Sequence, residues 1–259
     1  MWLVLGAETD QDARWAVESL HRRGLTSVMW VSAEALAHAV WVHQVGAASA
    51  SFAIELPDVG TLRSAELRGA INRLRLPTQV QTAVQAGGDA DYAWQELYAF
   101  YLSWLQAIPG PVLNPAQPRG LSGALRHPSE WMLLAARAGL RCAPYVATSR
   151  DGPDETWWPG TGLPQRVMGA PRKMIVVVGG TVVVQPGFEV PSAVRDAALA
   201  LSRLADSPLL GLYLALLPDG LVFAGAEMHP PLASFGDEMA DALASALLGT
   251  GTTTAEDPA

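Results

Sequence analysis

Two side chains near the C-terminal end have the types and the spacing for chemistry. Glu227 and His229 are two residues apart, so on a β-strand their side chains lie on the same face. A carboxylate next to an imidazole can ligate a metal ion or shuttle a proton. Pro230 and Pro231 follow directly, which indicates that the strand ends there, at the rim of a cleft. A solvated pair without chemistry is the alternative, and the residues alone leave both open.

Other reactive residues lack partners along the chain. Cys142 lies in an apolar run without a C-x-x-C partner, which predicts an inert buried thiol. Glu18 and His21 have the spacing of helical metal ligands, but no second copy of the motif exists to complete a site. The sequence contains no G-x-S-x-G, H-E-x-x-H or P-loop motif. These absences exclude the standard hydrolases, zinc proteases and P-loop NTPases.

Trp157 and Trp158 are adjacent within a Pro- and Gly-rich stretch, residues 149–171. Two neighbouring indoles in an irregular loop are hard to bury together, and exposed tryptophan is enriched at interface hot spots. The pair therefore predicts a partner-binding site. A cap over the core is the alternative.

Composition limits the class of protein. Half of the 259 residues are hydrophobic and 16% are charged, which predicts a folded core. A net charge of −8, with sixteen arginines and one lysine, argues against nucleic-acid binding. The single cysteine, the start without a basic region and the lack of an apolar run of about 20 residues predict a protein of the bacterial cytoplasm, not of the membrane.

The elements that hold these residues begin with a β-α-β unit. A strand over 2–5, a helix over 10–23 and a strand over 27–31 predict a parallel pair. Further helices are expected over 66–75, 90–107, 129–138, 192–205 and 237–248. Further strands are expected over 40–45, 51–56, 141–147, 209–217 and 221–226, with a hairpin over 173–185.

Five short segments, in this order, resemble the ATP-grasp ligases of the carboxylate–amine or peptide-maturase type. They are Ile71-Asn72-Arg73-Leu74, Gly110 to Pro115, His127 to Leu140, Gly211-Leu212-Tyr213-Leu214 and Glu227-Met228-His229-Pro230-Pro231. The resemblance covers residues 1–145 and 172–248.

The resemblance implies an α/β fold with an N-terminal β-α-β pre-ATP-grasp-like subdomain and a C-terminal α+β core of antiparallel strands. The divisions expected are a subdomain over 1–115, a linking helix and strand over 116–148, an irregular loop replacing the lid over 149–171, a core over 172–248 and a disordered tail over 249–259.

The same resemblance shows what the chain lacks. The family binds ATP under a lid with lysines on the phosphates, and an acid–acid–Asn set holds magnesium, a cation that requires oxygen ligands. Here Tyr213 and His229 stand in place of the Asp and the Asn, and Glu227 alone of the metal set is present. Lys173 is the one lysine, and Arg126 lies near the position of another. Ordinary ATP-grasp catalysis is therefore expected to be lost.

Four functional hypotheses follow. The first is a non-catalytic homologue, an accessory subunit that binds a modification or ligase enzyme or its peptide substrate and needs no cofactor. The second is an active ATP- and magnesium-dependent carboxylate–amine ligase that uses Arg126, Lys173 and Glu227. The third is new chemistry at Glu227 and His229, and the fourth is a self-associating structural protein, a homo-oligomer. Whether the chain is an enzyme stays open, with a non-enzyme favoured.

Overall fold

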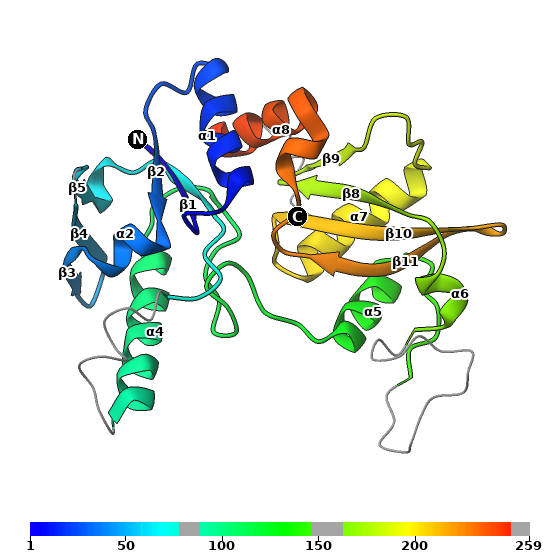
Figure 1. The fold of residues 1–259 in the computed structure, drawn as a ribbon, viewed down its shortest axis with the longest axis horizontal. Coiled ribbons are helices and arrows are strands. Elements are labelled where there is room, and N and C mark those ends of the chain that lie inside the picture. The colour runs from blue at the N-terminus through cyan, green and yellow to red at the C-terminus, as the bar shows by residue number, and fades with distance from the viewer. Residues whose placement is uncertain (58, 78–88, 147–162, 250–259) are drawn as a thin grey trace, which may run out of the picture. The chain divides into compact units, whose positions relative to one another are not determined.

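The computed structural model describes residues 1–57, 59–77, 89–146 and 163–249 (Figure 1). The chain divides into two compact units. The first comprises Met1–Ala124 and the last residues of the C-terminal helix, from Leu243. The second comprises Leu125–Ala242. Each unit has its own buried hydrophobic cluster.

The first unit begins with the predicted β-α-β motif. Strand β1 (Trp2–Gly6) is fully buried and pairs in parallel with β2 (Val28–Ser32). Helix α1 (Gln11–Arg22) lies between them, and the Asp10 carboxylate caps its first turn by accepting from the Ala13 N–H at 3.0 Å. Gly24, at φ +85°, follows the helix in a conformation that glycine adopts without strain. The parallel pair is confirmed.

The expected helix over 66–75 was wrong. A single 3₁₀ turn, η1 (Ser64–Glu66), is followed by strand β6 (Gly69–Asn72), which pairs in parallel with β1 and with the short β7 (Val112–Leu113). At Gly69 a Cβ atom would lie 2.4 Å from the Pro111 carbonyl oxygen and 2.8 Å from the Trp2 ring. Pairing on both sides of a buried strand overrides the local helical preference here. The resulting sheet has the order β2-β1-β6-β7.

A second, antiparallel sheet of the first unit has the order β3-β4-β5. Its strands are β3 (Val40–Val45), β4 (Ala50–Leu56) and β5 (Gly60–Arg63), and the short helix α2 (Ala33–Ala37) precedes them. Helix α4 (Ala90–Gln106) packs against this sheet through Tyr101, Trp104 and Leu105, which are buried. Phe52 and Trp104 meet edge to face at 5.5 Å. The predicted helix over 90–107 is confirmed.

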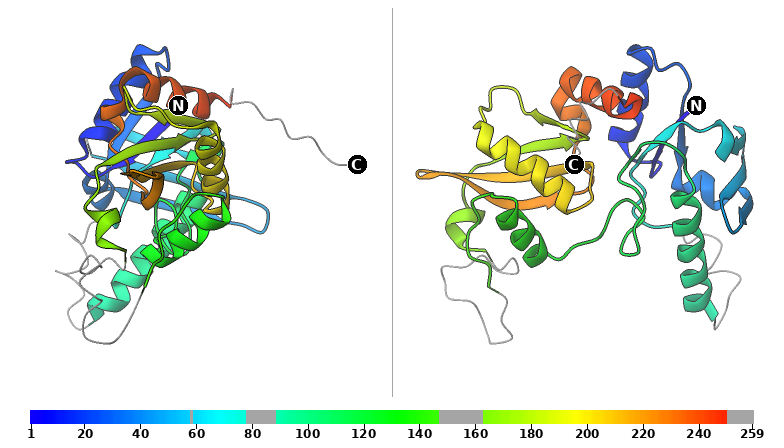
Figure 2. Two further views of the ribbon diagram at one scale, coloured as in Figure 1. Left: turned by 90° about the vertical axis from the view of Figure 1, so that its right-hand side faces the viewer. Right: turned by 180° about the vertical axis from the view of Figure 1, so that it is seen from behind.

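The second unit is built on an antiparallel sheet of order β11-β10-β8-β9 (Figure 2). The hairpin of β8 (Arg172–Val178) and β9 (Thr181–Val184) and the hairpin of β10 (Leu209–Leu217) and β11 (Gly220–Glu227) match the expected pairs. Helices α5 (Pro128–Arg137) and α7 (Ser192–Leu204) cover one face of this sheet. The chain continues through the 3₁₀ turn η3 (Leu232–Phe235) into α8 (Gly236–Leu248).

The expected strand over 141–147 is not formed in its described part, residues 141–146. Cys142 makes one isolated bridge to Phe223, and the Phe223 N–H donates to the Arg141 carbonyl at 2.8 Å. Pro144, which has no N–H to donate, follows two residues later and ends the pairing. Farther along, the described end of the stretch expected to be irregular contains the one-turn helix α6 (Gln165–Met168).

The predicted fold class is confirmed: a parallel β-α-β unit is followed by an α+β unit with antiparallel strands. None of the helices among the described residues is both long and apolar enough to cross a membrane. The expected tail falls almost wholly in 250–259, outside the described residues.

Candidate functional site

The register of β8, β10 and β11 brings one set of polar side chains to a common sheet face. Glu227 of β11 lies opposite Gly211 of β10. Tyr213 is two residues farther along β10, so it is on the same side of the sheet, and it lies opposite Met174 of β8. Arg172 lies opposite Ala215, again on that side. We call Arg172, Met174, Tyr213 and Glu227 the Glu227 face. Helices α5 and α7 pack on the other side of the sheet.

Tyr213 occupies the centre of the Glu227 face at a β-bulge between Tyr213 and Leu214. Its ring lies against Gly225, and the Arg172 guanidinium lies 5.8 Å from the ring centroid. Burial raises the pKa of the Tyr213 phenol, the Glu227 carboxylate raises it further, and Arg172 opposes the increase. Tyr213 is therefore a neutral hydroxyl at pH 7 and a poor substitute for a metal-binding carboxylate.

Glu227 and His229 are in contact, through the backbone of the histidine. The His229 N–H donates to Glu227 Oε1 at 3.3 Å, so the carboxylate closes the turn that follows β11. Pro230 packs over Gly211, where a Cβ would lie 3.0 Å from the Pro230 Cβ. Glu227 and His229 are both half-buried. The glutamate therefore has a structural role at the strand end in addition to any chemistry.

Lys173 and Arg126 do not join this group. Lys173 lies opposite Leu214, so its side chain is on the face away from Glu227. The Arg126 guanidinium pairs with Glu130, donates to the Ala205 carbonyl at 3.1 Å and lies over the Trp131 ring. These contacts fix Arg126 at the start of α5. The three charged residues that an unusual nucleotide site would need are thus not on one surface of the second unit.

The donor set of the Glu227 face does not fit magnesium. Glu227 supplies its one carboxylate, and Tyr213 supplies a neutral phenol. Within residues 1–57, 59–77, 89–146 and 163–249, no three His, Cys, Asp or Glu side chains are grouped so that they could hold a metal ion. Cys142 is far from a reactive thiolate, because burial raises its pKa to about 11.

Two further features bear on binding. Trp157 and Trp158 lie outside the described residues. Beside α6, which follows them in sequence, an open groove of ≈ 690 Å³ is lined by residues including Arg166, Pro171 and Leu216. Sequence reasoning missed Arg172 on the Glu227 face. The alternation of Arg172 and Met174 along a predicted strand was the signal that could have found it.

Comparison with known proteins gives structural relatives alone, since no family model and no curated protein sequence matches the chain. The macrocyclase MdnC of Microcystis aeruginosa, bound with precursor peptide MdnA, superposes with a TM-score of 0.71 at 11% identity, over 96% of this chain and 100% of that one. A peptide-modifying ("RiPP-associated") ATP-grasp ligase of Chryseobacterium gregarium, in complex with ADP and a leader and core peptide, gives 0.69 at 11% identity, over 97% of each chain.

The ATP-grasp ligase PsnB, complexed with a precursor variant, Mg and ADP, superposes with a TM-score of 0.67 at 15% identity, over 97% of this chain and 98% of that one. The agreement runs through both units of the chain. At these identities it is the fold that is shared. The chain has the fold of the ATP-grasp ligases.

Proposed function

We propose that this chain is a non-catalytic relative of the ATP-grasp ligases that binds a protein or peptide. It acts as an accessory subunit to a modification or ligase enzyme of the cytoplasm, or holds that enzyme's peptide substrate. One observation carries the proposal: the Glu227 face presents a neutral phenol, Tyr213, and a single carboxylate. Such a surface suits polar and apolar contacts better than a magnesium–triphosphate.

The charges expected for nucleotide chemistry support the same proposal. Lys173 faces away from Glu227, and Arg126 is occupied by Glu130 and the Ala205 carbonyl. Positioned positive charge is what phosphoryl transfer depends on. We infer that neither ATP nor magnesium is needed for the function. We also propose that residues 149–171 take the place of a nucleotide lid. The chain is then divided into residues 1–115, 116–148, 149–171 and 172–248.

Structural relatives favour a peptide as the bound molecule. MdnC is described with a bound precursor peptide, and the Chryseobacterium ligase with a leader and core peptide. Retaining this fold while losing the metal ligands would leave a peptide-binding scaffold. Trp157 and Trp158 are the anchors we assign to that contact, since paired indoles supply large apolar area at low entropic cost.

The test is a calorimetric titration of the purified chain with the macrocyclase MdnC, and separately with the precursor peptide MdnA that MdnC binds. We expect saturable binding to one of them without nucleotide. Replacing Trp157 and Trp158 together by Ala should weaken it at least about tenfold. Tyr92→Ala, at an exposed aromatic residue of α4, is the matched control and should bind normally. No binding to either molecule would contradict the proposal.

An active ATP-dependent ligase is the second candidate, because PsnB is described with Mg and ADP on the same fold. It would require Glu227, Lys173 and Arg126 to act on one nucleotide. It predicts magnesium-dependent ATP binding that is lost in Glu227→Ala. The two candidates are therefore separated by nucleotide binding.

A further inference from the structure

Strand β3 is an unprotected sheet edge. In the described part of the chain it pairs with β4 alone, and it stands at the end of the order β3-β4-β5. Its sequence, VWVHQV, contains no lysine, arginine, acid, proline or glycine. Edge strands are ordinarily protected by charges, prolines or bulges, because their free N–H and C=O groups accept another strand. Such protection is absent along all six residues of β3.

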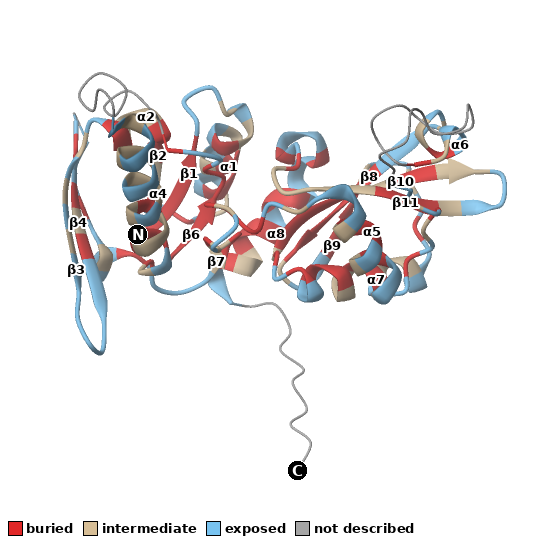
Figure 3. Ribbon diagram, turned by 90° about the horizontal axis from the view of Figure 1, so that it is seen from below, coloured by how far each residue is buried: buried red, intermediate tan, exposed pale blue. Residues whose placement is uncertain are grey.

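Two of the three outward side chains of this edge, Val40 and Val42, are apolar, and the third, Gln44, is uncharged. Figure 3 shows exposed residues along β3. Val40 is 64% exposed and Val42 is 53% exposed. Between them Trp41 faces the core and contacts Phe100 edge to face at 5.1 Å. His43 is fixed on the same inner side, with its Nε2 2.9 Å from the Ser103 hydroxyl. The inner side chains thus hold β3 rigidly against α4, and the outer valines remain uncovered.

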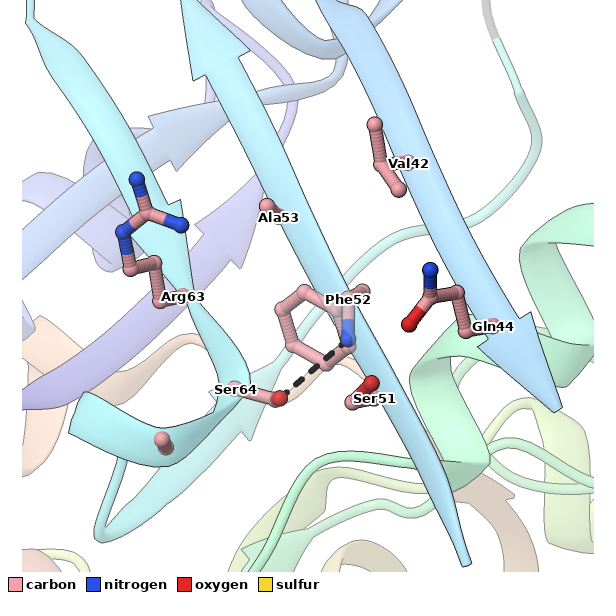
Figure 4. A pocket seen from close by; sticks show the side chains of 8 residues that line it. Val42, Gln44, Ser51, Phe52, Ala53, Arg63 and Ser64 are labelled. Atoms are coloured by element: carbon pink, nitrogen blue, oxygen red, sulfur yellow. Dashed lines mark hydrogen bonds between the residues drawn. The ribbon is translucent and has the colours of Figure 1, made fainter. Parts of the chain in front are cut away.

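The outer face continues from β3 across the sheet. Val42 lies opposite Ala53 of β4, and Ala53 lies opposite Arg63 of β5. Val42, Gln44, Ala53 and Arg63 line a shallow hollow of ≈ 310 Å³ on this face (Figure 4). The free strand therefore presents no charge on this face, Glu55 lies on the central strand opposite Val40, and the cation Arg63 lies on the far strand.

We propose that two copies of this chain pair through β3, antiparallel, to form one continuous six-stranded sheet. When a two-fold axis perpendicular to the sheet relates the two copies, each residue of β3 faces the same side as the residue opposite it in the second copy. Residues on one face of a strand have either all even or all odd numbers, so the numbers of two paired residues add to an even sum. With the axis at Val42, this valine meets Val42 of the second copy. Val40 then meets Gln44, and on the inner face Trp41 meets His43. Each pair is uncharged or aromatic.

Charge favours a second copy over a charged partner. The charged side chains on this face are Glu55 of β4 and Arg63 of β5. In the proposed register the two Glu55 residues are three strand spacings apart across the sheet, at least about 14 Å, and the two Arg63 residues are five spacings apart, roughly 24 Å. Both separations exceed the Debye length of about 8 Å at physiological ionic strength. No like charges meet at the joint, and a neutral strand offers nothing that would select an acidic or basic peptide.

The experiment is sedimentation of the full chain over a range of micromolar concentrations. We expect a dimer for the wild type and a monomer for Val42→Lys, because the two introduced ammonium groups would meet at the axis. Thr61→Lys adds the same charge to the same face on β5, at the other edge of the sheet, and should remain dimeric. Unchanged circular dichroism of Val42→Lys would show that folding is retained.

Cross-linking fixes the register. Val42→Cys should join two copies with a short thiol-to-thiol reagent, whereas Ala53→Cys, about 14 Å from its counterpart, should not. The native Cys142 contributes little background, since its pKa is raised to about 11. A monomeric wild type, or a Val42→Lys variant that stays dimeric, would overturn the proposal. Neither result depends on whether the chain binds a peptide or a nucleotide.

Discussion

The polar residues around Asn72 and Arg73 in the first unit differ sharply from those of the Glu227 face in the second. Asn72 is fully buried, donates to the Leu121 carbonyl at 2.6 Å and accepts from the Leu74 N–H at 3.2 Å. Arg73, 4% exposed, donates to both carboxylate oxygens of Asp10. On the Glu227 face, Tyr213 and Glu227 are only half-buried, and Arg172 is exposed.

Under the proposed function, this difference indicates which parts of an enzyme fold would survive the loss of its chemistry. A buried polar group without a partner destabilises the fold by a few kcal/mol, so the Asn72–Arg73 network can hardly change. Replacing the side chain of a half-exposed residue lowers the free energy of unfolding only a little. The residues expected to bind magnesium are of this second kind, and the phenol of Tyr213 occupies one of them without disturbing the sheet.

The largest effect is expected for Arg73→Met. The substitution leaves Asp10 without its guanidinium partner and should lower the free energy of unfolding by roughly 3–5 kcal/mol. Urea denaturation measures the change. Arg141→Met is the matched control, because the Arg141–Asp219 pair is exposed, at 47% and 58%, and should matter little. If the two variants lowered the free energy of unfolding equally, the buried Arg73–Asp10 pair would not stabilise the fold more than the exposed Arg141–Asp219 pair.

A smaller loss is expected for Asn72→Ala. Removing the amide leaves the buried Leu121 carbonyl and Leu74 N–H unpaired and should cost about 1–3 kcal/mol. Glu227→Ala, at a half-buried strand end, should destabilise the chain less in the same urea experiment. A Glu227→Ala variant that unfolds more easily than Asn72→Ala would show that the glutamate is a structural residue above all.

The smallest effect concerns ionisation of Tyr213. Glu227→Gln should lower its pKa and Arg172→Gln should raise it, since the first removes a nearby negative charge and the second a positive one. Tyrosinate absorbance during alkaline titration reports both, with Tyr213→Phe identifying the signal. Since the pKa of Tyr213 is raised on folding, the stability linked to it is intact below about pH 10 and is lost as pH rises further. If neither substitution changes the pKa of Tyr213, its phenol does not interact with Glu227 or Arg172.

Most of the fold was predictable because its elements carry local signals. The β-α-β opening shows a buried run, an Asp10 cap and Gly24, and the later hairpins show apolar runs that flank turn residues. One failure was a segment whose state depends on distant residues, and the other was an apolar run that a nearby proline interrupts. Gly69–Asn72 is a strand because β1 and β7 lie on either side of it, and Pro144 ends what an apolar run from Cys142 would otherwise continue.

The candidate site was predictable only in part. The spacing of Glu227 and His229 indicated two side chains on one strand face near the strand end, but β11 ends at Glu227 and His229 lies in the turn that follows. The register of β8 against β10 was not readable from either strand, and that register places Arg172 beside Tyr213 and turns Lys173 away. A shift of one residue would have exchanged these two cations, since neighbouring strand positions face opposite sides.

The most direct test of the account is a thermal-shift titration of the purified chain with Mg-ATP. A ligand that binds only the folded state, at 100 times its dissociation constant, stabilises it by about 2.7 kcal/mol, which raises the unfolding midpoint visibly. A non-catalytic chain should show no magnesium-dependent rise at millimolar ATP. A clear rise that requires magnesium and disappears in Glu227→Ala would contradict the proposed function and establish a working nucleotide site.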